Sequence, residues 1–418
     1  MKVLWLSNMA PGALCRFLTG KERSGLWMDH VLEDLRKEDR ITLHLLCPWQ
    51  DQREGKLEDS VSYCTFRRVL PQQVSEEQTE LFVSQLRKFR PDIIHIWGTE
   101  YGHTLSMVQA CQKLNLLDRT VISIQGLCHY VARHYLEGLP PEIQKRSTLR
   151  DFLKQNNILQ QQAVFYQRGE HEKQAISAVR HVIGRTAWDR ACVRQWNPAA
   201  EYYVCNETLR SSFYEGKWQY ENCTPHRIFA SSRLYPIKGF HGVLEAFSQI
   251  LRDFPDAVLA VPGDSPCCSG KARLRQDSYA RYLGELMEDY ELSDHVEFLG
   301  SLSEQQMRQQ YLKANVFVMP SSIENSSNSL GEAMLLGVPC TASHVGGVTT
   351  MLKPGEEGIV YQSTAPYMLA EAVKQIFDLG KEAEALGAAA AEHARSTHDP
   401  EKNLRDLLAI YRELSGEA

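Results

Sequence analysis

The sequence predicts an α/β protein made of two doubly wound, parallel-sheet domains, and three features of the chain lead to this prediction. The 418 residues exceed the ~100 to 200 residues of one typical domain. Short apolar runs alternate with helical stretches from end to end, as in repeated strand–helix–strand units. The alternation restarts after a polar, aromatic stretch around residues 211–225, so two domains of the same kind follow each other.

The first domain is predicted over residues 1–205. Its strands are nearly continuous apolar runs, which suits strands buried on both faces of a parallel sheet. They are expected at 3–7, 42–47, 93–97, 121–125, 181–184 and 202–205, with helices at 25–37, 76–89 and 104–114 among the connections.

A Gln-rich, helix-favouring stretch over about 133–178 contains no strand signal, and we interpret it as a helical insertion of the first domain. Residues 141–173 carry six Lys or Arg against four Asp or Glu. A solvated helical face is the simpler interpretation of this small basic excess. A contact with the acceptor, or a peripheral contact with a membrane surface, is the alternative.

The second domain is predicted over 227–399, after a linker at 206–226. Its strands are expected at 227–231, 257–262, 295–299, 316–320 and 339–343. The amphipathic segment 400–418 follows a Pro break and is expected to form a helix that crosses back to the first domain. Two such Rossmann-like domains would place ligands in a cleft at the carboxyl ends of their strands.

Composition excludes several classes of protein. Lys and Arg number 46 against 52 Asp and Glu, a net charge of −6, so we expect no general attraction to nucleic acid. The chain has no run of ~18 apolar residues, and its eleven cysteines form no C-x-x-C pair. We therefore expect a cytoplasmic protein with reduced thiols, with a peripheral position on the inner face of the membrane as the alternative.

The stretch 315–347 carries the most chemical information. A buried strand ends at Pro320, a polar loop follows, and a helix begins near Ser329 and ends at Gly337. The free N–H groups of such a helix start can bind a phosphate. Glu324 and Glu332 bracket the turn; because carboxylates would repel a diphosphate, we expect them to accept hydrogen bonds from sugar hydroxyls.

Two cations follow the first strand of the same domain. Arg233 and Lys238 stand just before a helix, where a guanidinium and an ammonium group together could neutralise a diphosphate. No D-x-D sequence occurs in the chain, and a Mg²⁺–diphosphate site usually uses one or two carboxylates. The sequence therefore predicts a site that needs neither metal nor cofactor.

Four motifs in register resemble glycosyltransferase family 4, the retaining GT-B enzymes. They are R-x4-K-G, a V-x-F-L-G strand end, E-x7-E-A-M, and G-x-P, found here as Arg233 with Lys238-Gly239, residues 296–300, Glu324 with residues 332–334, and residues 337–339. The resemblance covers the second domain, whereas the first domain matches mainly in strand order. It implies a GT-B fold with two Rossmann-like domains facing a central cleft.

The resemblance also implies roles for individual residues. Arg233 and Lys238 would bind the donor diphosphate, Glu324 would lie beside the donor sugar, and Glu332 would hold the ribose hydroxyls. Further donor contacts would come from Ser327, Asn328, Ser329, Leu330, Glu297, Phe298, Leu299 and, in the first domain, Gly25.

This sequence departs from the family pattern in three places. A polar run, 325–329, replaces the usual Gly and Phe between the glutamates. Ser24-Gly25 stands nearest to the glycine pair that many members have after the first strand, and Gln125 stands where the family often has a cleft histidine. Gln125, His129 and Glu100 are candidates for contacts with the sugar or acceptor.

The implied function is transfer of a sugar from a nucleotide-diphosphate sugar, with UDP or GDP expected, to a hydroxyl acceptor with retention of configuration. Assembly of cell-surface polysaccharides or glycoconjugates is the setting that the family suggests. Two alternatives stay open: a GT-B isomerase of the nucleotide-sugar 2-epimerase type, and a non-catalytic protein that binds nucleotide sugars. The predicted partners are the donor and the acceptor, with no nucleic acid.

Overall fold

The computed structural model describes residues 1–21, 28–231, 235–267 and 270–416. The chain divides into two compact units, each described here by itself. Unit 1 comprises Met1–Tyr130, Phe165–Arg210 and His398–Ala418, and unit 2 comprises Val131–Val164 and Ser211–Thr397.

Unit 1 is built on an eight-stranded sheet with the order β3-β4-β2-β1-β5-β6-β7-β8. All neighbouring strands are parallel except β3, which pairs antiparallel with β4. The strands are β1 Lys2–Ser7, β2 Thr42–Trp49, β3 Glu54–Lys56, β4 Val61–Arg67, β5 Ile93–Trp97, β6 Thr120–Ser123, β7 His181–Gly184 and β8 Glu201–Val204.

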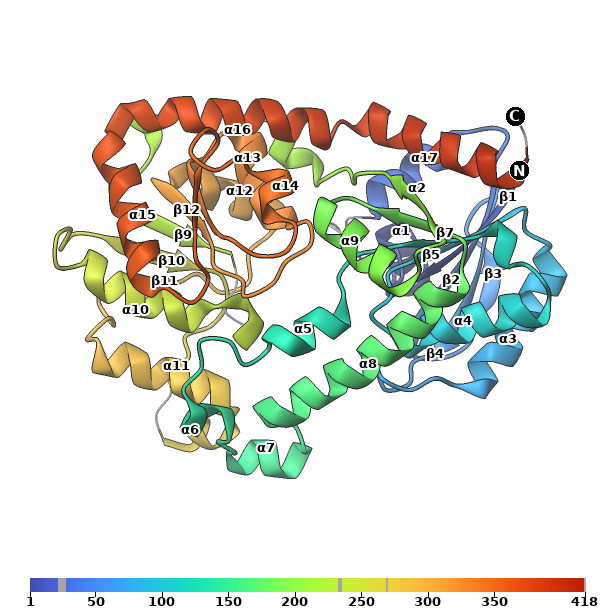
Figure 1. The fold of residues 1–418 in the computed structure, drawn as a ribbon, viewed down its shortest axis with the longest axis horizontal. Helices are drawn as coiled ribbons and strands as arrows, with labels where there is room; N and C mark the ends of the chain where they lie inside the picture. The colour runs from blue at the N-terminus through green and yellow to red at the C-terminus, as the bar shows by residue number, and fades with distance from the viewer. Residues whose placement is uncertain (22–27, 232–234, 268–269, 417–418) are drawn as a thin grey trace. The chain divides into compact units, whose positions relative to one another are not determined.

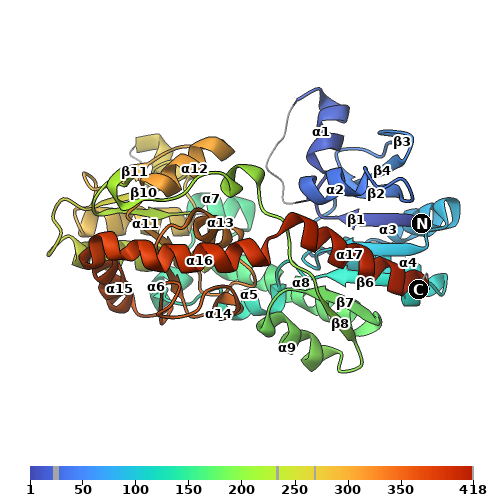
Figure 2. The ribbon, with the colours of Figure 1, turned by 90° about the horizontal axis from the view of Figure 1, so that it is seen from above.

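Helices cover both faces of this sheet (Figure 1). One layer contains α1 (Gly12–Thr19), α2 (Asp29–Leu35) and α17 (Pro400–Ser415), whose apolar side chains form one buried cluster with the sheet. In this layer α2 and α17 lie side by side (Figure 2). The other layer contains α3 (Glu76–Phe89), α4 (Gly102–Lys113), α8 (Ile158–Ala178) and α9 (Ala187–Trp196).

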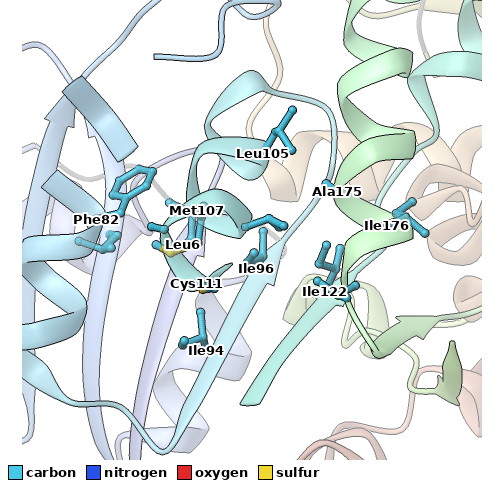
Figure 3. Close-up of a cluster of buried hydrophobic side chains, with 14 of the residues drawn as sticks. Leu6, Phe82, Ile94, Ile96, Leu105, Met107, Cys111, Ile122, Ala175 and Ile176 are labelled. Atoms are coloured by element: carbon cyan, nitrogen blue, oxygen red, sulfur yellow. The ribbon is translucent and has the colours of Figure 1, made fainter. Parts of the chain in front are cut away.

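On the side of the sheet that α3, α4, α8 and α9 cover, the core of unit 1 is a cluster of buried hydrophobic side chains (Figure 3). Ile94 and Ile96 of β5 contribute to it from the sheet, Phe82 from α3 and Met107 from α4. These apolar runs explain the predicted strands, because a central parallel strand is covered on both faces.

Unit 2 is built on a six-stranded parallel sheet with the order β11-β10-β9-β12-β13-β14. The strands are β9 Arg227–Ala230, β10 Val258–Val261, β11 Val296–Phe298, β12 Val316–Met319, β13 Cys340–Ser343 and β14 Ile359–Tyr361. The helices are α6 Pro141–Gln144, α7 Leu149–Lys154, α10 Phe240–Ile250, α11 Ser278–Asp289, α12 Glu304–Lys313, α13 Asn328–Leu336, α14 Val348–Met351, α15 Pro366–Leu379 and α16 Ala383–Thr397. Among them α10 packs on α11 and α15, and α13 packs on α12 and α16.

Local sequence explains where several helices begin. Ser303, at the start of α12, accepts a hydrogen bond from the backbone of Gln306, whose side chain accepts one from the backbone of Ser303. Asp399 caps α17, which has Pro400 at its first position. Such capping stabilises a helix by about 1 kcal/mol.

The observed division of the chain differs from the predicted one in the helical insertion. The sequence assigned all of 133–178 to the first domain, whereas residues 131–164 group with unit 2. The reason is a set of polar contacts with the start of α11: the Asp151 carboxylate accepts the backbone N–H of Ser278 (2.9 Å), and the Thr148 hydroxyl donates to the carbonyl of Gln276 (2.9 Å). Helices α5 (Cys128–His134) and α8 each cross the boundary between the units.

Three observed strands were missed in the sequence. Strand β3 is a short edge strand with all three residues exposed, so it has no apolar signal. In strand β4, Ser62 and Thr65 interrupt the continuous apolar run by which the other strands were predicted, and β14 has only three residues. None of the three changes the predicted sheet class.

Candidate functional site

The sheet of unit 2 changes its winding direction between β9 and β12. From β9 the chain adds β10 and β11 on one side, and β12 to β14 continue on the other side. The loops that leave the carboxyl ends of β9 and β12 therefore diverge. In open α/β sheets this switch point is where ligands bind.

The loop after β9 lies against the loop after β12. The backbone N–H of Ser322 donates to the carbonyl of Ile237 at 2.8 Å. Gly239 has φ +66°, and a Cβ there would lie 2.0 Å from the carbonyl oxygen of Pro320. Glycine is thus required both by the left-handed backbone and by the close approach, and this contact fixes Lys238 beside the β12 loop.

Lys238 and Glu324 form an ion pair at this switch point. The Lys238 Nζ lies 2.9 Å from Glu324 Oε1 and 3.2 Å from Oε2. The side chains are 32% and 20% exposed, so both groups remain accessible to a ligand. The structure therefore brings together two of the predicted site residues, which lie 86 positions apart in the sequence.

The glutamate is held by the loop after β13. The backbone N–H of Gly347 donates to the carbonyl of Glu324 at 3.0 Å. Gly346 has φ +48°, and a Cβ there would lie 2.0 Å from that carbonyl oxygen. Two loops that follow neighbouring strands thus position Glu324.

Helix α13 begins at the end of the same loop. Ser327 caps it: its hydroxyl oxygen accepts the backbone N–H of Leu330 (3.4 Å) and lies 3.0 Å from the Ser329 hydroxyl. Glu332 lies in this helix and is 3% exposed. Asn328 and Ser329 are half-buried in the first turn, where helix N–H groups carry a partial positive charge. The predicted helix, from near Ser329 to Gly337, is confirmed.

Two predicted residues of the donor site, Arg233 and Gly25, lie outside the described residues. Glu297 lies within the described residues but away from Lys238 and Glu324, and its carboxylate forms an ion pair with Arg227 at 2.7 Å. Phe298 ends β11, and the Leu299 backbone N–H donates to Val261 at 3.0 Å. Glu297 and Phe298 lie on the edge strand β11, and Leu299 directly follows it. Strand β10 lies between β11 and β9, so these residues are separated from the switch point.

Unit 1 has its own switch point between β1 and β5, and Glu100 follows β5 there. The Glu100 carboxylate accepts hydrogen bonds from the Asn8 amide (2.7 Å) and the backbone N–H of Gly126 (3.1 Å). The His103 ring lies 3.0 Å from the Asn8 amide oxygen. Burial raises the pKa of Glu100 above its usual value.

Glu172 of α8 lies buried behind this loop and was not singled out in the sequence. Its carboxylate accepts hydrogen bonds from the Thr99 hydroxyl (2.5 Å) and from the backbone N–H groups of Cys128 and His129 (3.2 Å each). The side chain is 1% exposed, and burial raises its pKa to about 8, with the nearby charge of Glu100 acting in the same direction. It sits in a Gln-rich helix that resembles a solvated one, so no sequence signal reveals its burial.

Gln125 and His129 lie in two different environments. The Gln125 amide donates to Glu207 (2.5 Å), and Arg185 binds both Glu207 (2.7 Å) and the Gln125 carbonyl (3.1 Å). The His129 ring instead packs against the aromatic ring of Trp196, 5.8 Å between centroids. Gln125 thus belongs to a charged cluster, and His129 to an aromatic one.

A pocket in unit 1 adjoins the charged cluster. Residues of the strand ends and of α17 line it, among them Trp97, Ser123, Arg185, Glu207, Asn403 and Leu407. Its cavity volume is about 30 Å³, roughly the volume of one water molecule, so it is too small to hold a nucleotide or a sugar.

No group of three or more His, Cys, Asp or Glu side chains among the described residues is placed to hold a metal ion. No described helix combines the length and apolar character needed to cross a bilayer.

Comparison with known structures confirms the predicted fold class. Sucrose-phosphate synthase from Thermosynechococcus elongatus superposes with a TM-score of 0.71 over 100% of both chains, at 17% identity. The protein thus has the GT-B class of fold, with two parallel-sheet α/β domains. The cleft predicted between them remains a prediction.

Comparison with known sequences finds a family match within unit 2 and two relatives that match part of the chain. Residues 218–393 match the family model of group 1 glycosyl transferases. The chain is 28% identical over 183 residues to a D-inositol 3-phosphate glycosyltransferase of Corynebacterium urealyticum, covering 44% of this chain and 42% of that protein. It is 29% identical over 172 residues to a GDP-mannose-dependent alpha-(1-6)-phosphatidylinositol monomannoside mannosyltransferase of Mycobacterium tuberculosis, covering 40% of this chain and 42% of that protein. The matched part thus spans about two fifths of either relative.

Proposed function

We propose that the protein is a retaining, metal-independent glycosyltransferase of family 4 that moves a sugar from a nucleotide-diphosphate sugar to a hydroxyl acceptor. The observation that carries the proposal is the Lys238–Glu324 pair at the switch point of unit 2. The match of residues 218–393 to group 1 glycosyl transferases supports it.

In the proposed reaction the diphosphate leaves as the bond to the sugar breaks, and the acceptor oxygen bonds to the same carbon on the same face. The leaving phosphate takes the acceptor proton, so no protein nucleophile is needed. Lys238 and the first turn of α13 would stabilise the negative charge that develops on the diphosphate, a contribution that typically accelerates a reaction about 10²- to 10³-fold. Arg233 is expected to add a second cation.

The two glutamates have different proposed tasks. Glu332 would accept hydrogen bonds from the ribose hydroxyls, and Glu324 would lie beside the donor sugar, where it also orients Lys238. Glu100 and Gln125 are proposed to act on the acceptor side. The relatives' names suggest GDP-mannose as one donor and an inositol-containing acceptor as one acceptor class, and UDP-sugars are the other donors to test.

The experiment has two stages. A thermal-shift panel of UDP-, GDP-, ADP- and TDP-sugars identifies the donor, because a ligand that binds only the native state raises Tm. The bound donor is then incubated with and without hydroxyl acceptors, in EDTA, and products are followed by NMR.

Each outcome has one meaning for the proposal. A glycoside with the donor's anomeric configuration supports it. An epimer formed from donor alone indicates the isomerase, and binding with no turnover under any acceptor indicates a binding protein. Activity restored only by a divalent metal would refute metal independence.

A further inference from the structure

Helix α7 of unit 2 exposes an apolar face. Leu149, Phe152 and Leu153 are 58%, 75% and 72% exposed. Their spacing of three and four residues places them on one side of the helix. Leu274, in the 3-10 segment Gly270–Arg275 that contacts α7, is 62% exposed and adds a fourth large apolar side chain.

The opposite side of α7 fixes this orientation. Asp151 is fully buried and takes part in the capping box of α7 with Thr148. Its carboxylate also accepts the backbone N–H of Ser278 at the start of α11, at 2.9 Å. Turning the apolar face inward would remove these bonds from a buried carboxylate, which is costly. The exposure of the apolar face is therefore built into the fold, at the same end of unit 2 as α6 and α11 (Figure 1).

Positively charged residues lie near the apolar residues in the chain. Lys145, Lys154 and Arg275 are exposed, and none of them has an ion-pair partner within the described ranges of the chain. Two further cations are paired: Arg146 with Glu285, and Arg150 with Asp277. The one exposed acid of the preceding helix α6 is Glu142, so the surface keeps a positive excess.

We propose that this surface, the α7 patch, docks unit 2 onto an anionic lipid bilayer. The patch consists of Leu149, Phe152, Leu153 and Leu274 with Lys145, Lys154 and Arg275. Exposed large apolar side chains together with exposed Lys and Arg match the boundary between lipid headgroups and acyl chains. A symmetric contact between two copies would instead bring like charges together, so charge complementarity favours lipid over a second chain. The proposal does not depend on the transfer reaction.

The test is flotation of the full chain with vesicles of phosphatidylcholine, with and without about one third phosphatidylserine. We expect binding to the anionic vesicles only, weakened by salt as surface charge is screened. No binding to anionic vesicles, or equal binding to both kinds, overturns the proposal.

Two variants separate the apolar from the charged contribution. Phe152→Ser with Leu153→Ser is expected to weaken binding at least about tenfold, given the area lost. Lys145→Gln with Lys154→Gln is expected to weaken it about 25-fold, at about fivefold per charge. All four side chains are exposed, so Tm should not change.

Matched controls lie elsewhere in unit 2. Tyr367 is 64% exposed, so Tyr367→Ser controls for loss of an exposed apolar group. Lys217 is exposed and has no ion pair to any described residue, so Lys217→Gln controls for loss of charge. Equal binding by the patch variants and these controls would refute the proposal. So would a lipid-free dimer, seen by sedimentation velocity, that Phe152→Ser with Leu153→Ser dissociates, because the face would then belong to a second copy.

Discussion

Lys238 and Glu324 form an ion pair across the junction of β9 and β12, with the ammonium nitrogen 2.9 Å from the nearer carboxylate oxygen. The ammonium group of Lys238 therefore cannot meet a phosphate without the negative charge of Glu324 close by. This relationship predicts that the two residues affect nucleotide binding in opposite directions.

Lys238→Ala should weaken the binding of a nucleoside diphosphate and lower turnover about 10²- to 10³-fold. Glu324→Gln should strengthen nucleoside diphosphate binding, because it removes a negative charge and releases Lys238. Isothermal titration calorimetry measures the affinity of each variant for the nucleoside diphosphate, and a rate assay measures turnover. Lys353→Ala is the control, since Lys353 is 61% exposed and pairs with Glu357 at 3.9 Å. The same direction of change in both site variants would contradict the arrangement.

Gly346→Ala should destabilise the protein and reduce donor binding, because the new Cβ would lie 2.0 Å from the Glu324 carbonyl oxygen. Gly355→Ala is a matched control: its φ is +79°, yet a Cβ there meets nothing within 4 Å. The control should lose only the ~1 to 2 kcal/mol that a left-handed backbone costs a residue with a Cβ. Urea unfolding and donor titration compare the stability and donor binding of the two variants. Equal losses of stability would show that the contact between Gly346 and the Glu324 carbonyl is unimportant.

Glu172 should make the stability of unit 1 fall as pH rises. Its pKa is raised to about 8 in the folded protein, against a usual value near ~4.3. The folded state therefore binds more protons than the unfolded state between these values, and its stability declines as pH rises through that window, with a limiting slope of about 1.4 kcal/mol per pH unit.

The Glu172→Gln variant isolates this effect. Its free energy of unfolding should improve relative to wild type as pH is raised from about 5 to 8. Subtracting the wild-type free energy of unfolding from that of the variant cancels the contribution of buried histidines such as His95. The pKa of His95 is lowered to about 3, so its contribution to stability rises with pH. A difference that does not vary with pH would show that Glu172 is ionised throughout.

Tyr411 should hold α17 on the sheet of unit 1. Its hydroxyl accepts the Trp5 indole N–H at 2.9 Å and lies 2.6 Å from His95 Nδ1, all fully or almost fully buried. Tyr411→Phe should cost about 1 to 3 kcal/mol, because buried polar groups lose their partner. Denaturant unfolding followed by tryptophan fluorescence measures the loss. Tyr367→Phe, at a side chain that is 64% exposed, should leave the midpoint unchanged.

The parallel-sheet fold class and the Lys238–Glu324 pair could be predicted because both leave a pattern in the local sequence. Central strands such as Ile93–Trp97 are apolar throughout because helices cover both faces. The sequence also predicted that Lys238 and Glu324 share one site, because each follows the carboxyl end of a strand and the carboxyl ends of parallel strands lie at one edge of the sheet.

Other features depend on tertiary contacts that leave no local signal. Glu172 looks like any acid on a solvated helix until α8 is placed against the start of α5. Asp151 is likewise an ordinary capping residue in the sequence, and its bond to Ser278 is one of the tertiary contacts that group residues 131–164 with unit 2.

The position of α17 affects how the protein is made. Residues from the last helix, Leu407 and Tyr411, are buried in the same cluster as Val3 and Trp5 of the first strand. Residues 1–399 must therefore be synthesised before α17 can complete this part of the core of unit 1. Until α17 has been synthesised and has packed, the nascent chain would expose that apolar face of the sheet.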